Sequence, residues 1–135
     1  MTPVDLSLQP DEIRDQAALL LHEAFNNEIG WPTLDAARAE VAHVIEEGFA
    51  RALLDRGTLL GWVGGLPEYR GRVWELHPIV IRPGHRRRGL GRRLVAAFEA
   101  EARARGALTM TLGTDDDAGI TSLAGPRWWA PCSTA

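Results

Sequence analysis

The stretch from residue 73 to residue 106 most constrains the fold, because it predicts a strand, a tight turn and a helix in that order. Residues 73–81 (VWELHPIVI) are mostly β-branched, aromatic or aliphatic, and Pro83 follows them, which is typical of a strand that ends there. Residues 92–105 carry apolar side chains at helical spacing, and Gly106 is a typical helix stop. The apolar face of this helix is expected to comprise Leu94, Val95, Phe98 and Ala102.

The turn between this strand and helix has the composition of an anion site. Five of the residues from 86 to 93 are arginines, and the Gly-Leu-Gly of residues 89–91 allows the backbone to curl closely around a ligand. A helix N-terminus adds unpaired N–H groups and the positive end of a dipole. The order strand, Arg-x-x-Gly-x-Gly, helix therefore predicts a site for a phosphorylated ligand. The residues expected to form it are Arg86, Arg87, Arg88, Gly89, Leu90, Gly91 and Arg92.

Composition leaves other interpretations of the turn to be weighed. Consecutive arginines also occur at a solvated basic helix start. A nucleic-acid partner is disfavoured, because the formal net charge is −3 and no second basic cluster occurs. The turn is not a Walker loop, since no Gly-Lys-Ser/Thr follows it. It is not a dinucleotide fingerprint either, since the GxGxxG spacing is absent.

The pattern resembles the acyl-CoA loop of the GNAT acetyltransferases, in which Arg/Gln-x-x-Gly-x-Gly/Ala wraps the pyrophosphate of coenzyme A. Residues 74–78 (WELHP), 112–116 (LGTDD) and 121–123 (TSL) are similar to the aminoglycoside 6′-N-acetyltransferases. The similarity covers residues 60–124 well and the N-terminal part loosely. It implies acetyl-CoA as the acetyl donor and the 6′-amino group of an aminoglycoside as the acceptor, an activity that confers antibiotic resistance.

The resemblance implies an α/β (α+β) fold, the GNAT fold, with a mixed and mostly antiparallel sheet flanked by helices. Periodicity and turn residues along the chain agree with it. Besides the strand and helix above, the expected elements are a strand at 4–8, helices at 10–25 and 33–48, strands at 49–55 and 58–65, a turn at 67–72, and a last strand at 107–114.

The C-terminal part departs from the resembling enzymes, which continue with another helix and two strands. Residues 118–135 show no helical or alternating period. We therefore expect a truncated chain, with an incomplete GNAT domain at 1–124 and an irregular tail at 125–135. The strand at 107–114 would keep an open edge, and this favours a homodimer.

Two side chains of the organising strand are the candidates for catalysis. Residues two apart on a strand face the same side, so Glu75 and His77 are expected to project together. Glu75 is the first candidate for a general base, because a carboxylate flanked by Trp74 and Leu76 is costly to bury without a cationic partner such as a bound amine. His77 is the second candidate, and a satisfied, partly buried histidine is its alternative interpretation.

The same strand supplies backbone groups. Pro78 cannot donate to a sheet ladder, and so it predicts a bulge or an edge immediately after His77. The resemblance implies that such a bulge exposes N–H groups to the acetyl carbonyl and the pantetheine arm, and that an N–H near Ile79 stabilises the oxyanion. The residues expected to bind the coenzyme here are His77, Pro78, Ile79, Val80 and Ile81.

An aminoglycoside is a polycation, so its site is expected to be acidic. Asp115 matches the LGTDD pattern and is a candidate contact with the acceptor. Trp31, in the loop between the first two helices, is a candidate wall of the cleft, with a packing anchor as the alternative. Resembling enzymes protonate the departing thiolate with a tyrosine, but the single tyrosine, Tyr69, precedes the strand. The general acid is therefore expected to be missing or replaced.

The remaining features concern the cellular compartment, membrane and metal binding, and the other possible functions. A lone cysteine, Cys132, favours a reducing cytoplasm. No basic leader or apolar run of about 20 residues predicts a signal peptide or a membrane span. The histidines are scattered, so no metal site is expected. Two other functions stay open, namely acetyl transfer to another cationic amine and non-catalytic binding of acetyl-CoA.

Overall fold

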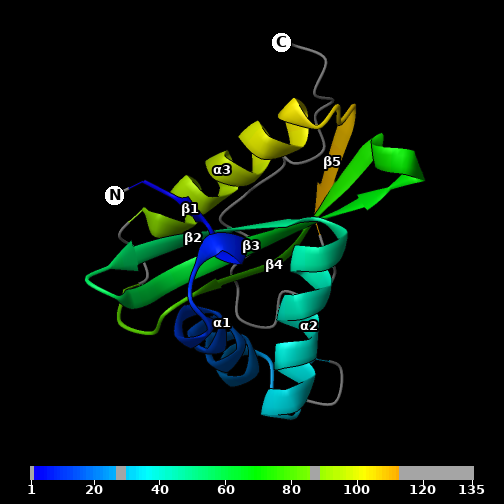
Figure 1. Ribbon diagram of the computed structural model, residues 1–135. Helices are drawn as coiled ribbons and strands as arrows, with labels where there is room; N and C mark the ends of the chain where they lie inside the picture. Colours follow the sequence, from blue (N-terminus) through cyan, green and yellow to red (C-terminus); the bar gives the residue numbers. More distant parts are fainter. Residues whose placement is uncertain (1, 27–29, 86–88, 113–135) are drawn as a thin grey trace.

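A computed structural model describes residues 2–26, 30–85 and 89–112, and its centre is a five-stranded sheet in the order β1-β2-β3-β4-β5. Neighbouring strands are antiparallel from β1 to β4, whereas β5 lies parallel to β4. Helices α1 and α2 cover one face of the sheet and α3 covers the other (Figure 1). The elements are β1 (Val4–Asp5), η1 (Leu6–Leu8), α1 (Asp11–Ala24), α2 (Leu34–Glu47), β2 (Phe49–Asp55), β3 (Thr58–Glu68), η2 (Tyr69–Gly71), β4 (Val73–Ile81), α3 (Leu90–Ala104) and β5 (Thr109–Leu112).

Each face of the sheet carries its own apolar core. Under α3, the expected helix face is confirmed, because Leu94, Phe98 and Ala102 are buried and Val95 is partly buried against the same cluster. Under α1 and α2, the largest buried side chain is Trp62 of β3, whose Nε1 donates to the carbonyl oxygen of Ala17 at 3.0 Å. This hydrogen bond satisfies the indole N–H that burial would otherwise leave without a partner.

Most expected elements are confirmed, because their signals are local. Thr33 caps α2 by accepting a hydrogen bond from the Ala36 N–H at 3.1 Å, and Gly48 ends that helix. The turn at 56–57 joins β2 to β3, and both residues have positive φ. Among the described residues, no helix is both long and apolar enough to cross a bilayer.

Three boundaries differ from expectation. The first strand stops at Asp5, because its carboxylate accepts hydrogen bonds from the Ser7 N–H at 2.9 Å and the Ser7 hydroxyl at 2.7 Å, and these turn the chain into η1. The predicted turn at 67–72 is shorter, because Pro67 is still paired with Trp74 in the ladder. The last strand spans Thr109–Leu112, and residues 113–114 of its predicted range lie outside the described residues.

A β-bulge interrupts β4, as Pro78 predicts. Val63 pairs with Ile79 and Gly65 pairs with Leu76, so His77 and Pro78 together oppose the single residue Gly64. The bulge changes which face the following side chains meet. Trp74 and Leu76 before it, and Ile79 and Ile81 after it, all lie in the cluster under α3, so the alternation shifts by one residue at the bulge.

Candidate active site

Glu75 and His77 lie on the face of the sheet that α1 and α2 cover. Both side chains are partly exposed, whereas Trp74 and Leu76, which alternate with them, are buried under α3. His77 lowers the pKa of the Glu75 carboxyl by electrostatic attraction when its ring is protonated, so the two groups are also electrostatic neighbours. The strand therefore places the two candidate catalytic side chains together, as their spacing predicts.

Two elements outside the strand hold His77. Its Nε2 lies 3.3 Å from Oε2 of Glu40 on α2. Its ring also contacts the ring of Trp31, with a centroid separation of 5.5 Å. Trp31 in turn packs edge-on against Phe25, and its carbonyl oxygen lies 2.9 Å from Nδ1 of His22. Trp31 is therefore anchored by packing, and its ring lies beside His77; its role as a wall of the acceptor cleft stays a prediction.

The pKa of Glu75 is raised above its ordinary value. Burial is the largest cause, because it disfavours the charged carboxylate. Glu68 of β3 and Glu40 of α2 raise the pKa further by repulsion, while His77 opposes them by attraction. A partly buried carboxyl with a raised pKa, flanked by other carboxylates, is suited to accept a proton from a cationic amine.

Some backbone N–H groups of β4 point toward β3, and the others point away from it. Arg82 N donates to the carbonyl oxygen of Leu60 in β3 at 2.7 Å. In an antiparallel ladder, residue pairs that exchange backbone hydrogen bonds alternate with pairs that do not. Val80 therefore also bonds to β3, whereas the N–H groups of Ile79 and Ile81 point away from β3. The ladder between β4 and β5 ends at Leu76, before these two residues. Within the described residues, their amides are therefore available beside the bulge.

The described part of the predicted anion site lies at the start of α3. Gly89 is the N-cap residue of α3, with φ of 76° and ψ of 8°, a left-handed conformation that favours glycine. Leu90 and Gly91 are buried, and Arg92 is exposed. The predicted contacts Arg86, Arg87 and Arg88 lie outside the described residues, and so does the predicted acceptor contact Asp115.

Other candidates can be placed directly. Tyr69 is 75% exposed at the tip between β3 and β4, with φ of 50°. No group of three or more His, Cys, Asp or Glu side chains in the described part of the chain is arranged to hold a metal ion.

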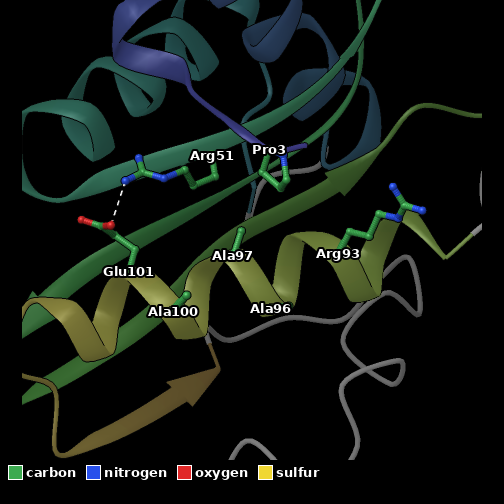
Figure 2. A pocket seen from close by; sticks show the side chains of 7 residues that line it. All are labelled: Pro3, Arg51, Arg93, Ala96, Ala97, Ala100 and Glu101. Atoms are coloured by element: carbon green, nitrogen blue, oxygen red, sulfur yellow. Dashed lines mark ion pairs between the residues drawn. The ribbon is translucent and has the colours of Figure 1, made fainter. Parts of the chain in front are cut away.

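An open groove of about 580 Å³ lies on the opposite face of the sheet, along α3. Figure 2 shows Arg51 of β2 reaching toward Glu101 of α3 on one side of it, and their charged atoms lie 3.0 Å apart. Burial alone would raise the pKa of Glu101, but the hydrogen bond from Arg105 and the charge of Arg51 lower it below its ordinary value. The sheet separates this groove from Glu75. The Arg51–Glu101 ion pair therefore links α3 to β2 and is not part of the candidate site.

The sequence did not reveal Glu40 and Glu68 as part of the site. A signal for Glu40 does exist, because Ala37, Val41 and Val44 form the buried stripe of α2 and Glu40 falls within that stripe at helical spacing. A charged residue at such a position is costly to bury unless it has a partner. Identifying that partner as His77 requires the packing of α2 on the sheet.

Comparison with known proteins is consistent with this geometry. The model of the acetyltransferase (GNAT) family matches residues 12–124. An aminoglycoside 6′-N-acetyltransferase solved with coenzyme A is 34% identical, with a TM-score of 0.76 over 86% of this chain and 63% of the other. The aminoglycoside 6′-N-acetyltransferase from Enterococcus faecium is also 34% identical, with a TM-score of 0.73 over 86% and 63%.

An aminoglycoside 6′-acetyltransferase of type Ii is 31% identical, with a TM-score of 0.76 over 93% of this chain and 82% of the other. No curated protein matches the chain. The chain thus spans 63% of the length of the first two of these solved enzymes. The expected GNAT fold is confirmed, and the chain belongs to the acetyltransferase (GNAT) family.

Proposed function

We propose that the protein transfers an acetyl group from acetyl-CoA to the 6′-amino group of an aminoglycoside. The observation that carries this proposal is Glu75, a partly buried carboxyl with a raised pKa among other carboxylates, on a strand where the Ile79 and Ile81 amides have no ladder partner among the described residues. The similarity to three solved structures of aminoglycoside 6′-acetyltransferases, at 31–34% identity, supports the choice of acceptor.

The described residues fit the roles that such a transfer requires. The amine nitrogen bonds to the acetyl carbon while the carbon–sulfur bond of the thioester breaks, and positioning supplies much of the rate. Glu75 takes the proton that the ammonium group must lose, and the departing thiolate takes a proton from water. The N–H of Ile79 would stabilise the negative charge that develops on the carbonyl oxygen. Glu40 and Glu68 would attract the other amino groups of a polycationic acceptor.

The start of α3 fits the pyrophosphate of the donor, because a helix N-terminus offers N–H groups and a positive dipole end. We expect Gly89→Ala to raise the KM for acetyl-CoA about tenfold, because a left-handed residue with a side chain costs about 1–2 kcal/mol and displaces the loop. Steady-state kinetics with varied acetyl-CoA would measure this change, and the KM for the acceptor should move less.

Gly106→Ala is the matched control for that substitution. Gly106 follows the other end of the same helix, also has a positive φ, of 95°, and also has open space where a Cβ would stand. Gly106→Ala should therefore carry the same cost of a left-handed residue with a side chain, without a change in the KM for acetyl-CoA. Equal KM values in the two variants would contradict the placement of the donor at the start of α3.

The proposed function is tested by mixing the purified chain with acetyl-CoA and an aminoglycoside and following release of free thiol. The matched control acceptor carries a 6′-hydroxyl group in place of the 6′-amine. We expect turnover with the 6′-amine alone. Turnover with both would point to another amino group, and turnover only with an unrelated cationic amine would change the acceptor class. If acetyl-CoA raises the melting temperature but no amine is acetylated, the chain is a non-catalytic coenzyme-binding module.

The proposal includes Asp115 as an acceptor contact and Arg86, Arg87, Arg88, Leu90, Gly91 and Arg92 as donor contacts. It also includes a homodimer in the cytoplasm. In the described part of the chain, β5 forms one edge of the sheet and the neighbouring Leu108 is 59% exposed, which supports self-association. Sedimentation equilibrium of the purified chain would measure the oligomeric state.

A further inference from the structure

We propose that Glu40 is a positioning residue for the transfer, which holds the His77 ring with Nε2 toward α2 and leaves Nδ1 as the ring nitrogen that can accept a proton. The inference rests on the proposed function and extends it to a residue on another element. Its basis is the contact between Oε2 of Glu40 and Nε2 of His77, at 3.3 Å.

The first step concerns Glu40 itself. Its side chain is 19% exposed, and it lies in the same stripe of α2 as the buried residues Ala37, Val41 and Val44. A carboxylate at such a depth needs a donor or a positive partner. Among the described residues, His77 is the partner of Glu40. The packing of α2 on the sheet brings the Glu40 carboxylate to this ring.

The second step concerns the orientation of the ring. A carboxylate is an acceptor only, so it favours a ring that carries hydrogen on the nitrogen facing it, here Nε2. The contact with Trp31, at a centroid separation of 5.5 Å and an interplanar angle of 49°, restrains the ring from a second direction. In a neutral imidazole with hydrogen on Nε2, Nδ1 is the nitrogen that accepts a proton.

The third step concerns the charge at Glu75. Burial, Glu68 of β3 and Glu40 of α2 raise the pKa of Glu75, while His77 of β4 lowers it. Removing the Glu40 charge therefore lowers the pKa of Glu75, so the acid limb of the pH–rate profile should move to lower pH. Glu40 thus contributes in two separable ways: its carboxylate orients the His77 ring, and its charge raises the pKa of Glu75.

The test compares Glu40→Ala, which removes both contributions, with Glu40→Gln, which keeps an acceptor oxygen but no charge. We expect Glu40→Ala to lower kcat about tenfold and to leave the KM for acetyl-CoA within about twofold. Glu40→Gln should retain most of kcat, whereas the acid limb should move to lower pH in both variants. The control is Glu47→Ala, since Glu47 is an exposed residue of the same helix.

A second readout does not depend on turnover. In ¹H–¹⁵N spectra of the histidine rings, assigned for His77 by comparison with His77→Gln, the wild-type protein should show hydrogen on Nε2. Glu40→Ala should show a larger share of the form with hydrogen on Nδ1. If no amine is acetylated, the proposed function fails and this spectrum still tests the positioning. Wild-type kcat in Glu40→Ala, an equal loss in Glu40→Gln, or an unchanged ring pattern would each overturn the inference.

Discussion

Glu75→Gln should lower kcat by a factor of about 10²–10³, the usual contribution of a positioned general base. Glutamine keeps the shape of the side chain but cannot take the ammonium proton. Because glutamine also removes the cost of burying a carboxylate, which outweighs the attraction from His77, the fold itself should be no less stable. Thiol release under saturating acetyl-CoA and acceptor, together with the melting temperature of the variant, would separate lost chemistry from lost structure.

The pH dependence gives the same prediction a second readout. In the proposed reaction the active form of Glu75 is the deprotonated one, and burial and the neighbouring carboxylates raise its pKa. The rate of the wild-type protein should therefore fall as the pH drops through the raised pKa of Glu75, which lies above the ordinary glutamate value. This limb should disappear from the residual activity of Glu75→Gln. A suitable control is Asp55→Asn at the exposed end of β2. An unaltered limb in Glu75→Gln would assign the base to another group.

Gly64→Ala should destabilise the protein by about 3 kcal/mol, at the upper end of what overpacking costs. A Cβ at Gly64 would stand 2.5 Å from the carbonyl oxygen of His77 and 2.6 Å from a methyl carbon of Val44. The first of these atoms is backbone at the bulge, so relief requires β4 or α2 to move. Equilibrium unfolding in urea would measure the loss.

Gly57→Ala is the control for the steric part of that effect. Gly57 has a φ of 81° and open space around its Cβ position, so its substitution carries a conformational cost of about 1 kcal/mol and no clash. A loss at Gly64 no greater than the loss at Gly57 would mean that β4 and α2 adjust easily. The bulge would then not be held rigidly by the packing around it.

The elements that the sequence predicted well are those specified by their own residues. The helix after Gly89 follows from apolar spacing, and the start of α2 follows from the side chain of Thr33. The bulge at Pro78 follows from a missing donor. Each depends on covalent structure or on neighbours within one turn, so no knowledge of tertiary packing was needed.

The features that the sequence did not predict depend on competition between alternative hydrogen bonds, or on partners that are distant in the sequence. Asp5 prefers its hydrogen bonds with Ser7 to continuing the strand, and apolar alternation does not reveal that choice. Pro67 stays in the ladder because Tyr69 and Arg70 adopt positive φ and close the connection within a short helical turn. Glu40 meets His77 only after α2 has packed on the sheet.

The bulge in β4 has a consequence for how this site tolerates change in chain length. Because His77 and Pro78 together oppose one residue of β3, the segments on either side of the bulge are registered independently against the sheet. Deleting one of these two residues would leave a single residue opposite Gly64, so Ile79 and Ile81 would keep their partners in β3 and their place in the core under α3. A single deletion at the bulge would therefore remove the bulge while leaving the core under α3 in place, whereas a deletion elsewhere in β4 would turn one part of the strand over.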